Sequence, residues 1–169
     1  MPFGLFGGDA STRDQDLAAL ADAIDGQGLF RDVPASKLKK LVPLMRVKSF
    51  EDEEIVCNCE DADHDAFVLL SGVAAVTKNL QERQYVLQLK SKGALFNAGP
   101  LVGAEAAHRG ARALGKVSLV AMDNDALRKL SAEDPELGYP IGWNLCRLSI
   151  DQHERQIEHH LAVSPQVAL

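Results

Sequence analysis

Between Arg46 and Asp123 the sequence breaks into short apolar or alternating segments, and this pattern restricts the fold more than any other feature. The segments are separated by turn signals at Ser71-Gly72, Lys92-Gly93 and Gly115. Many short strands with polar turns are typical of an antiparallel roll or barrel. The expected strands are Arg46–Phe50, Glu54–Cys59, Ala66–Leu70, Val73–Lys78, Tyr85–Lys90, Ala113–Val117 and Leu119–Asp123.

Helical spacing of apolar residues appears on both sides of this region. A second helix is expected after Pro34 with Ser36 as its cap, and further helices over Asn124–Lys129 and from Asp134 or Gly142 to His160. The predicted class is mainly β: an antiparallel, jelly-roll-like β-roll with N-terminal helices and a C-terminal helix. The predicted organisation is a leader (1–12), a helix (13–27), the β-roll (28–130), a C-terminal helical segment (131–162) and a tail (163–169).

Charge and composition exclude several classes of protein. The net charge is −6, which argues against general nucleic-acid binding, because phosphate neutralisation needs clustered Lys and Arg. The one dense basic run, Lys37 to Lys48, is interpreted as a solvated face. No apolar run approaches the ~20 residues of a membrane span, and the first residues do not form a signal peptide. We therefore expect a cytoplasmic protein without membrane contact.

Catalytic and metal motifs are missing from the sequence. It contains no nucleophile elbow, phosphate loop or His-Glu-x-x-His pattern, so we expect no enzymatic activity. Cys57 and Cys59 share one face of a strand and are interpreted as core thiols, since Cys146 is distant and a metal site needs more ligands. His153 and His160 share a helix face, but a solvated helix end is the simpler explanation. No metal or cofactor is expected.

Several segments, in order, carry a family resemblance. They are Gly28 to Leu41, Phe50 to Val56, Asp65 to Val76, Lys92 to Phe96 and Val117 to Leu127. This series resembles the cyclic-nucleotide-binding domain of the catabolite-activator and protein-kinase-A-regulatory-subunit superfamily. The resemblance implies a β-roll, a phosphate-binding cassette after Gly93, and a C-terminal helix that forms a dimer interface. Family transcription factors add a helix-turn-helix domain after that helix, and since this chain ends at Leu169 we expect no operator binding.

The cassette departs from the family pattern at the positions that would hold the ligand. The resemblance implies a Gly-Glu pair for the ribose and an Arg about ten residues later for the cyclic phosphate. An ungapped alignment places these positions on Asn97, Ala98 and Ala107. Ala98 cannot accept a ribose hydroxyl, and Ala107 offers the phosphate no charge. A second family glycine, which opens the second strand, is replaced by Glu53. We expect little affinity for cAMP.

A remodelled cassette is the alternative. Gly103, Glu105 and either Arg109 or Arg112 could supply the same groups. Glu105 and Arg109 are four residues apart, so a surface ion pair on a helical turn explains them as well. A haem-dependent sensor would need a cassette histidine, and His108 is interpreted instead as a loop residue.

The C-terminal helix carries an apolar seam with alternating steps of three and four residues. Its residues are Trp143, Cys146, Ile150, His153 and Ile157. It favours a homodimer slightly over packing against the roll, and histidines in it would weaken association at low pH. The predicted function is a non-enzymatic signalling or scaffold module that acts through protein contacts. The alternative is a sensor for a cyclic nucleotide or another small anion.

Overall fold

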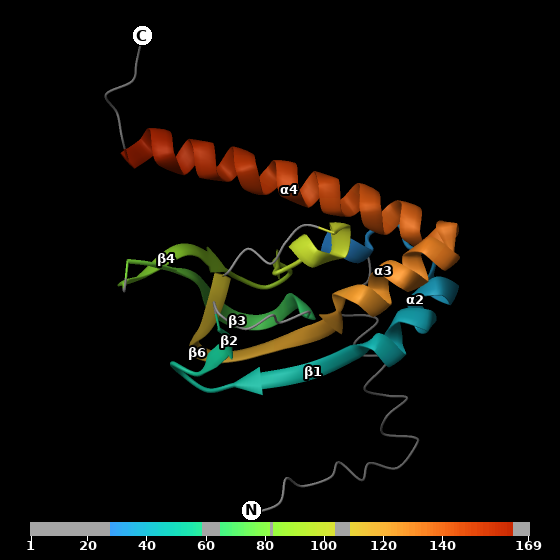
Figure 1. The fold of residues 1–169 in the computed structure, drawn as a ribbon, viewed down its shortest axis with the longest axis horizontal. Helices are drawn as coiled ribbons and strands as arrows, with labels where there is room; N and C mark the ends of the chain where they lie inside the picture. Colours follow the sequence, from blue (N-terminus) through green and yellow to red (C-terminus); the bar gives the residue numbers. More distant parts are fainter. Residues whose placement is uncertain (1–27, 59–64, 82, 104–108, 164–169) are drawn as a thin grey trace, which may run out of the picture.

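The structure is a computed structural model that describes residues 28–58, 65–81, 83–103 and 109–163. A long helix, α4, lies across one side of a β-roll, and shorter helices gather at one end (Figure 1). The helices are η1 (Gly28–Phe30), α2 (Ala35–Leu41), η2 (Val42–Leu44), η3 (Gly99–Val102), α3 (Asn124–Glu133) and α4 (Pro135–Val163). The strands are β1 (Met45–Phe50), β2 (Ile55–Cys57), β3 (Asp65–Leu80), β4 (Arg83–Lys90), β5 (Leu95–Phe96) and β6 (Arg109–Asp123). The expected leader and helix over 13–27 lie outside the described residues.

The strands form one antiparallel sheet of six strands. Neighbouring strands follow the order β1-β6-β3-β4, while β2 also pairs with β6 and β5 with β3. This arrangement confirms the predicted class, a mainly antiparallel β-roll with flanking helices.

Two expected strand breaks are wrong. Residues 66–78 form part of a single strand, β3, and residues 113–123 part of β6. The pairing of β3 with β6 shifts register between Leu69 and Val73, and Gly72 lies there with φ +83°. A Cβ on Gly72 would lie 2.2 Å from the Lys116 carbonyl oxygen, so glycine is needed where the two backbones approach. Gly72 therefore marks a bulge within continuous strands, and it was expected to be a turn because a bulge and a turn use the same residue type.

Other element ends differ by a few residues from the expectation. β2 ends at Cys57, α3 extends to Glu133, and α4 begins at Pro135, a favoured first helical position. Ser36 is not a helix cap: α2 begins at Ala35, and its N-cap residue, Pro34, makes no side-chain capping bond. The turn at Gly93 is confirmed between β4 and β5.

Two apolar clusters form the core. One fills the inside of the roll, where Phe67 is fully buried and stacks on Phe96 with ring centroids 5.1 Å apart. The other lies under the helices and joins Phe30, Leu41 and Met122 to Leu137 and Ile141 of α4. The N-terminal part of α4 is therefore built into the core.

The base of α4 is also fixed by backbone contacts. Asn144 is 2% exposed and donates from Nδ2 to the carbonyl oxygens of Leu29 and Arg31 at 3.1 and 2.5 Å. At Gly138, α4 crosses α3 so closely that a Cβ would lie 2.1 Å from the Ser131 carbonyl oxygen. None of the described helices is both long enough and apolar enough to cross a membrane.

Asp134, at the junction of α3 and α4, holds α2 in place. Its carboxylate accepts hydrogen bonds from Lys37 at 2.8 Å and Lys40 at 2.6 Å. These bonds lower the pKa of Asp134 from 3.8 to about 2. Part of the basic run is therefore used in ion pairs between helices rather than on a purely solvated face.

Acid should weaken this junction in a defined pH range. A carboxyl whose pKa is lowered by folding stabilises the fold fully above its unfolded pKa, near 3.8, and loses that contribution as the pH falls to about 2. Asp134→Asn should therefore lower the melting temperature at pH 6, and the gap to the natural chain should shrink between pH 4 and 2. Glu133→Gln, an exposed neighbour, is the control. An unchanged gap at pH 2 would contradict this assignment.

Candidate functional site

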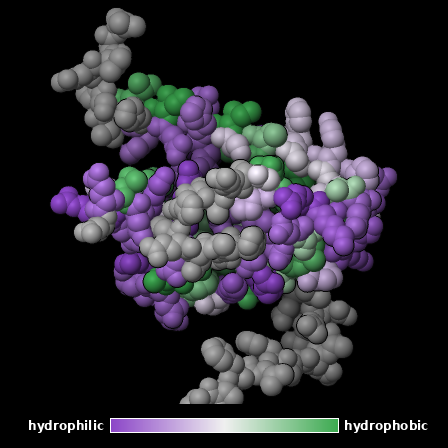
Figure 2. Space-filling view, viewed as in Figure 1, coloured by the Kyte–Doolittle hydropathy of each residue, from purple (hydrophilic) through white to green (hydrophobic). Residues whose placement is uncertain are grey.

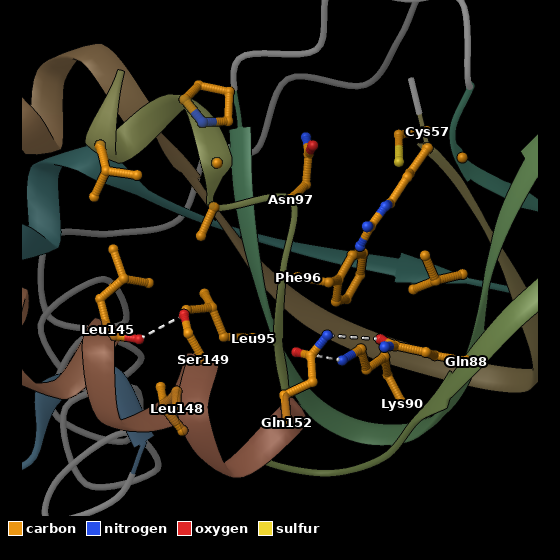
Figure 3. A pocket seen from close by; sticks show the side chains of 17 residues that line it. Cys57, Gln88, Lys90, Leu95, Phe96, Asn97, Leu145, Leu148, Ser149 and Gln152 are labelled. Atoms are coloured by element: carbon orange, nitrogen blue, oxygen red, sulfur yellow. Dashed lines mark hydrogen bonds between the residues drawn. The ribbon is translucent and has the colours of Figure 1, made fainter. Parts of the chain in front are cut away.

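A pocket of about 310 Å³ lies between the β-roll and α4, beside the loop that follows β5 (Figure 3). The roll contributes both charged and apolar side chains, while α4 contributes two leucines and two polar residues. The residues that line it include Cys57, Gln88, Lys90, Phe96, Ala98, Arg109, Leu145, Leu148, Ser149 and Gln152. A cavity with a few polar groups in an apolar lining is the usual form of a small-molecule site.

The loop after β5 occupies the place where the cassette is expected. It runs through Asn97 and Ala98 into η3, and Gly103 ends η3 with φ 75°. The Gly103 N–H donates to the Pro100 carbonyl oxygen at 3.0 Å. Ala98 lines the pocket and presents only a methyl group to it. At this position the pocket offers no acceptor for a sugar hydroxyl.

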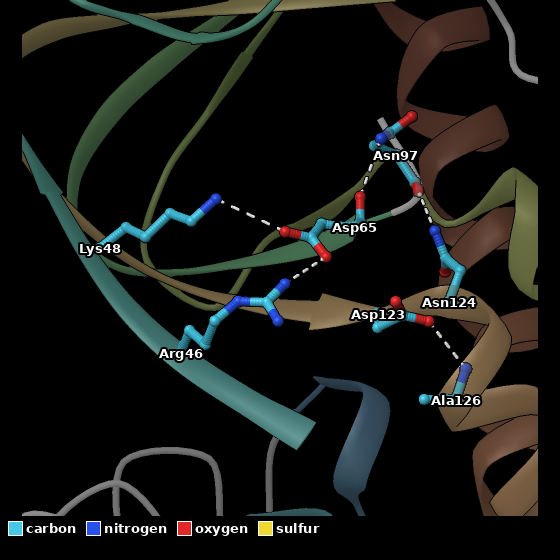
Figure 4. A network of polar contacts seen from close by, with 7 residues as sticks. All are labelled: Arg46, Lys48, Asp65, Asn97, Asp123, Asn124 and Ala126. Atoms are coloured by element: carbon cyan, nitrogen blue, oxygen red, sulfur yellow. Dashed lines mark hydrogen bonds and ion pairs between the residues drawn. The ribbon is translucent and has the colours of Figure 1, made fainter. Parts of the chain in front are cut away.

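Asn97 fixes the start of this loop through a chain of hydrogen bonds (Figure 4). Its Nδ2 donates to the Asp65 carbonyl oxygen at 2.8 Å, and its own carbonyl oxygen accepts from Nδ2 of Asn124 at 3.1 Å. The Asp65 carboxylate in turn accepts from Arg46 at 2.6 Å and Lys48 at 3.5 Å. The loop is thus attached to β3 and α3, which makes one wall of the pocket rigid.

Two residues at positions where the resemblance implies a glycine have the backbone conformation that glycine favours. Asn97 has φ 55° and Glu53 has φ 65°, both in the left-handed region. Asn tolerates this region better than most residues, because its side chain can make local hydrogen bonds. Glu53 is further held by an ion pair with Arg112 at 2.9 Å. Both residues therefore hold a backbone conformation that is more usual for glycine.

Lys90 is the buried cation of the pocket, with 8% of its surface exposed. Its Nζ donates to Gln152 Oε1 at 3.0 Å, and Gln152 Nε2 donates to Gln88 Oε1 at 3.0 Å (Figure 3). Burial lowers the pKa of the Lys90 ammonium group, and the charges of Arg109 and Arg155 lower it further. Within the described ranges no carboxylate forms an ion pair with Lys90.

The residues of the expected remodelled cassette are not brought together as a set. Arg109 lines the pocket at the start of β6. Arg112 lies at the surface, where its Nη1 and Nη2 bond Glu53 and Gln84 at 2.9 and 3.4 Å. Gly103 ends η3, whereas Glu105 and Ala107 lie outside the described residues. Of the two candidate arginines, Arg109 is the one placed at the cavity.

The predicted dimer seam lies on the side of α4 that the roll leaves uncovered. Trp143 is 66% exposed and Ile150 62%, and Cys146, His153 and Ile157 are exposed as well. In the space-filling view, hydrophobic residues (green) follow α4 along the top of the molecule (Figure 2). On the opposite side of the pocket, Cys57 is buried, while Cys59 lies outside the described residues. Within the described ranges, no group of three His, Cys, Asp or Glu side chains is arranged to hold a metal.

Lys90 and Gln152 were not singled out from the sequence. Lys90 looks like the polar end of an ordinary strand, and Gln152 like one polar residue of a polar helix. The available signal was the alternation of β4, which places Gln88 and Lys90 on one face of the strand. It could not show that α4 covers that face.

Comparison with known proteins gives a consistent result. The family described as "Cyclic nucleotide-binding domain" matches residues 47–134, about half of the chain. No curated protein sequence matches. Among solved structures, a cyclic nucleotide-binding domain from Methylobacillus flagellatus superposes with a TM-score of 0.73 and 17% identity, covering 88% of this chain and 84% of that one.

Two further solved structures have the same architecture. The sensor domain of the transcriptional regulator DNR from Pseudomonas aeruginosa has a TM-score of 0.68 and 16% identity, covering 85% of this chain and 95% of that one. The Thermus thermophilus catabolite activator protein has a TM-score of 0.61 and 17% identity, covering 80% and 62%. At these identities the structures bear on the fold alone. With the match over residues 47–134, the chain belongs to the cyclic nucleotide-binding domain family.

Proposed function

We propose that this chain is a non-enzymatic regulatory domain that senses a small ligand in the pocket between the β-roll and α4. The observation that carries the proposal is the open pocket of about 310 Å³ with a buried lysine in its lining. A module working through protein contacts alone has no need of an uncompensated buried charge, which costs stability. This observation favours the sensor over the protein-contact module that the sequence alone suggests first.

The ligand is not cAMP bound in the family's usual way. Ala98 lines the pocket, and the resemblance aligns it with the family carboxylate that accepts the ribose hydroxyls. A site built to hydrogen-bond a hydroxyl gains much of its discrimination from that one partner. We therefore expect the ligand to be a different small molecule.

A thermal-shift panel tests this function. The full chain is heated with cAMP, cGMP, cyclic dinucleotides, phosphate monoesters and carboxylates, each at about 1 mM. A ligand at 100 times its Kd adds about 2.7 kcal/mol, or roughly 5–11 °C for a chain of this size. We expect a shift with at least one non-nucleotide compound. The cyclic nucleotides should stay below about 2 °C, the effect of a Kd of 1 mM or weaker.

The panel has two results that would contradict the proposal. A shift of several degrees with cAMP would mean that a family-type site persists without its carboxylate. No shift with any compound would leave the pocket without a small-molecule role. In that case the protein-contact hypothesis would be preferred.

Protein contact through α4 is the second candidate function, and it is compatible with the first. The observation that favours it is the uncovered seam of α4, extended by Tyr139 (74% exposed) and Leu161 (55% exposed). Apolar stripes with this spacing are typical of helices that pair with another helix. A second copy of the chain is the proposed partner.

A further inference from the structure

The pocket has an uneven distribution of charge. The whole chain is negatively charged, with a net charge of −6. The charged groups that act on the buried Lys90 ammonium are nevertheless both positive, Arg109 and Arg155. The neutral amide of Gln152 is the acceptor that satisfies Lys90. Arg109 lines the pocket at an exposed position, and its guanidinium makes no hydrogen bond or ion pair with another described residue. Buried charges are normally paired, and among the described residues the buried Lys90 ammonium has no carboxylate partner.

The remaining lining limits the size and shape of the ligand. A volume of about 310 Å³ is near the lower end of the range, roughly 300–1,000 Å³, that ligand pockets occupy. Phe96 and two leucines of α4, Leu145 and Leu148, form an apolar side of the pocket. A compact ring or short chain could pack there while a polar group reaches the cations.

Taken together, charge and shape define a ligand class. We infer that the pocket binds a small organic anion, whose carboxylate or phosphate group contacts Lys90 and Arg109 while its apolar part packs against Phe96 and Leu148. This inference rests on the proposed function and adds the chemical class of the ligand and the anchoring residue. Lys90 comes from β4, outside the cassette loop, so the anchor is supplied by the wall of the roll.

The inferred anchor also predicts that the buried charge lowers the stability of the ligand-free protein. Keeping the Lys90 ammonium away from water without a counter-charge destabilises the fold, and an anion removes that penalty. Lys90→Met, which removes the charge and keeps an unbranched side chain one atom shorter, should therefore raise the melting temperature of the ligand-free chain by about 2–4 °C. A residue with a purely structural role would lower it when replaced.

The test uses three probes on the full 15N-labelled chain, followed by NMR chemical-shift changes. Phenyl phosphate and phenylacetate carry the two anionic groups, and 2-phenylethanol is the neutral analogue. We expect the anions to bind more tightly than the alcohol, and the stronger of the two anions identifies the headgroup. Lys90→Met should weaken anion binding by at least about 30-fold, and Arg109→Met by about 2- to 5-fold.

Two further variants separate the inference from the proposed function. Lys92→Met removes an exposed lysine just beyond β4 and should change nothing. Ser149→Phe, at an exposed position of α4 that lines the pocket, should block every probe.

Four results would overturn the inference. Binding that is blocked by Ser149→Phe but unchanged by Lys90→Met would refute the anion anchor and leave the sensor function standing. Binding that survives both variants would place the probes elsewhere and would count against the sensor function too. A natural chain that binds none of the probes, or a ligand-free Lys90→Met variant that melts lower, would also reject the inference, and the thermal-shift panel would then decide on the function.

Discussion

Gly138→Ala should lower the free energy of unfolding by about 3 kcal/mol, or roughly 6–12 °C in melting temperature. The added Cβ would lie 2.1 Å from the Ser131 carbonyl oxygen and 2.8 Å from its carbonyl carbon. Both atoms belong to the backbone of α3, so no side chain can rotate away, and α4 would have to shift as a whole. Because the base of α4 also carries Leu137 and Asn144, this shift would disturb the core and the buried hydrogen bonds together.

The same helix supplies the control for this variant. Gly142 is exposed, and a Cβ there meets nothing within 4 Å. Gly142→Ala should therefore raise stability by about 0.5–1 kcal/mol, the ordinary gain in helix propensity. Urea unfolding of the two variants gives opposite signs if the close crossing at Gly138 is real. Equal and small effects would mean that the two helices can separate without cost.

The combined variant Trp143→Asp, Ile150→Asp should abolish self-association of the chain. Both side chains are more than 60% exposed on the uncovered side of α4, and they are seven residues apart. In a helix pair these positions face the partner, where two added carboxylates per chain would be desolvated and repel each other. Light scattering should change from a dimer to a single chain of 18.3 kDa.

A matched substitution elsewhere tests whether the seam is specific. Val47 on β1 is 56% exposed, so Val47→Asp adds the same charge at a similar exposure but away from α4. It should leave the mass unchanged. A natural chain that is monomeric at about 100 μM would refute the homodimer, and the seam would then have to be tested against other protein partners.

The fold was largely predictable because the local sequence patterns and the order of the elements indicate the same architecture. Alternation along β4 and the helical stripe of α4 each specify an element, and the order of the elements resembles one family closely enough to suggest the topology. The bulge at Gly72 was misinterpreted as a strand break, since a single sequence does not distinguish a chain reversal from a close approach of two backbones.

The site was less predictable because it depends on contacts between distant segments. Lys90 and Gln152 are 62 residues apart and meet only because α4 crosses the roll. Likewise, nothing local shows that Asp134 accepts hydrogen bonds from two lysines of α2. That Ala98 stands in place of the cassette carboxylate stays a prediction from the resemblance, whereas the buried cation of the pocket, Lys90, could not be predicted from it.

The pairing order of the strands also has a consequence for synthesis on the ribosome. β1 and β2 pair with β6, and about 60 residues separate the end of β1 from the start of β6. At a typical elongation rate of 5–20 residues per second, β1 waits for roughly 3–12 s before its partner has been made. An unpaired strand can join other chains during that interval. Arg46 and Lys48, which later pair with Asp65, give the waiting strand two positive charges and so protect the nascent chain against aggregation.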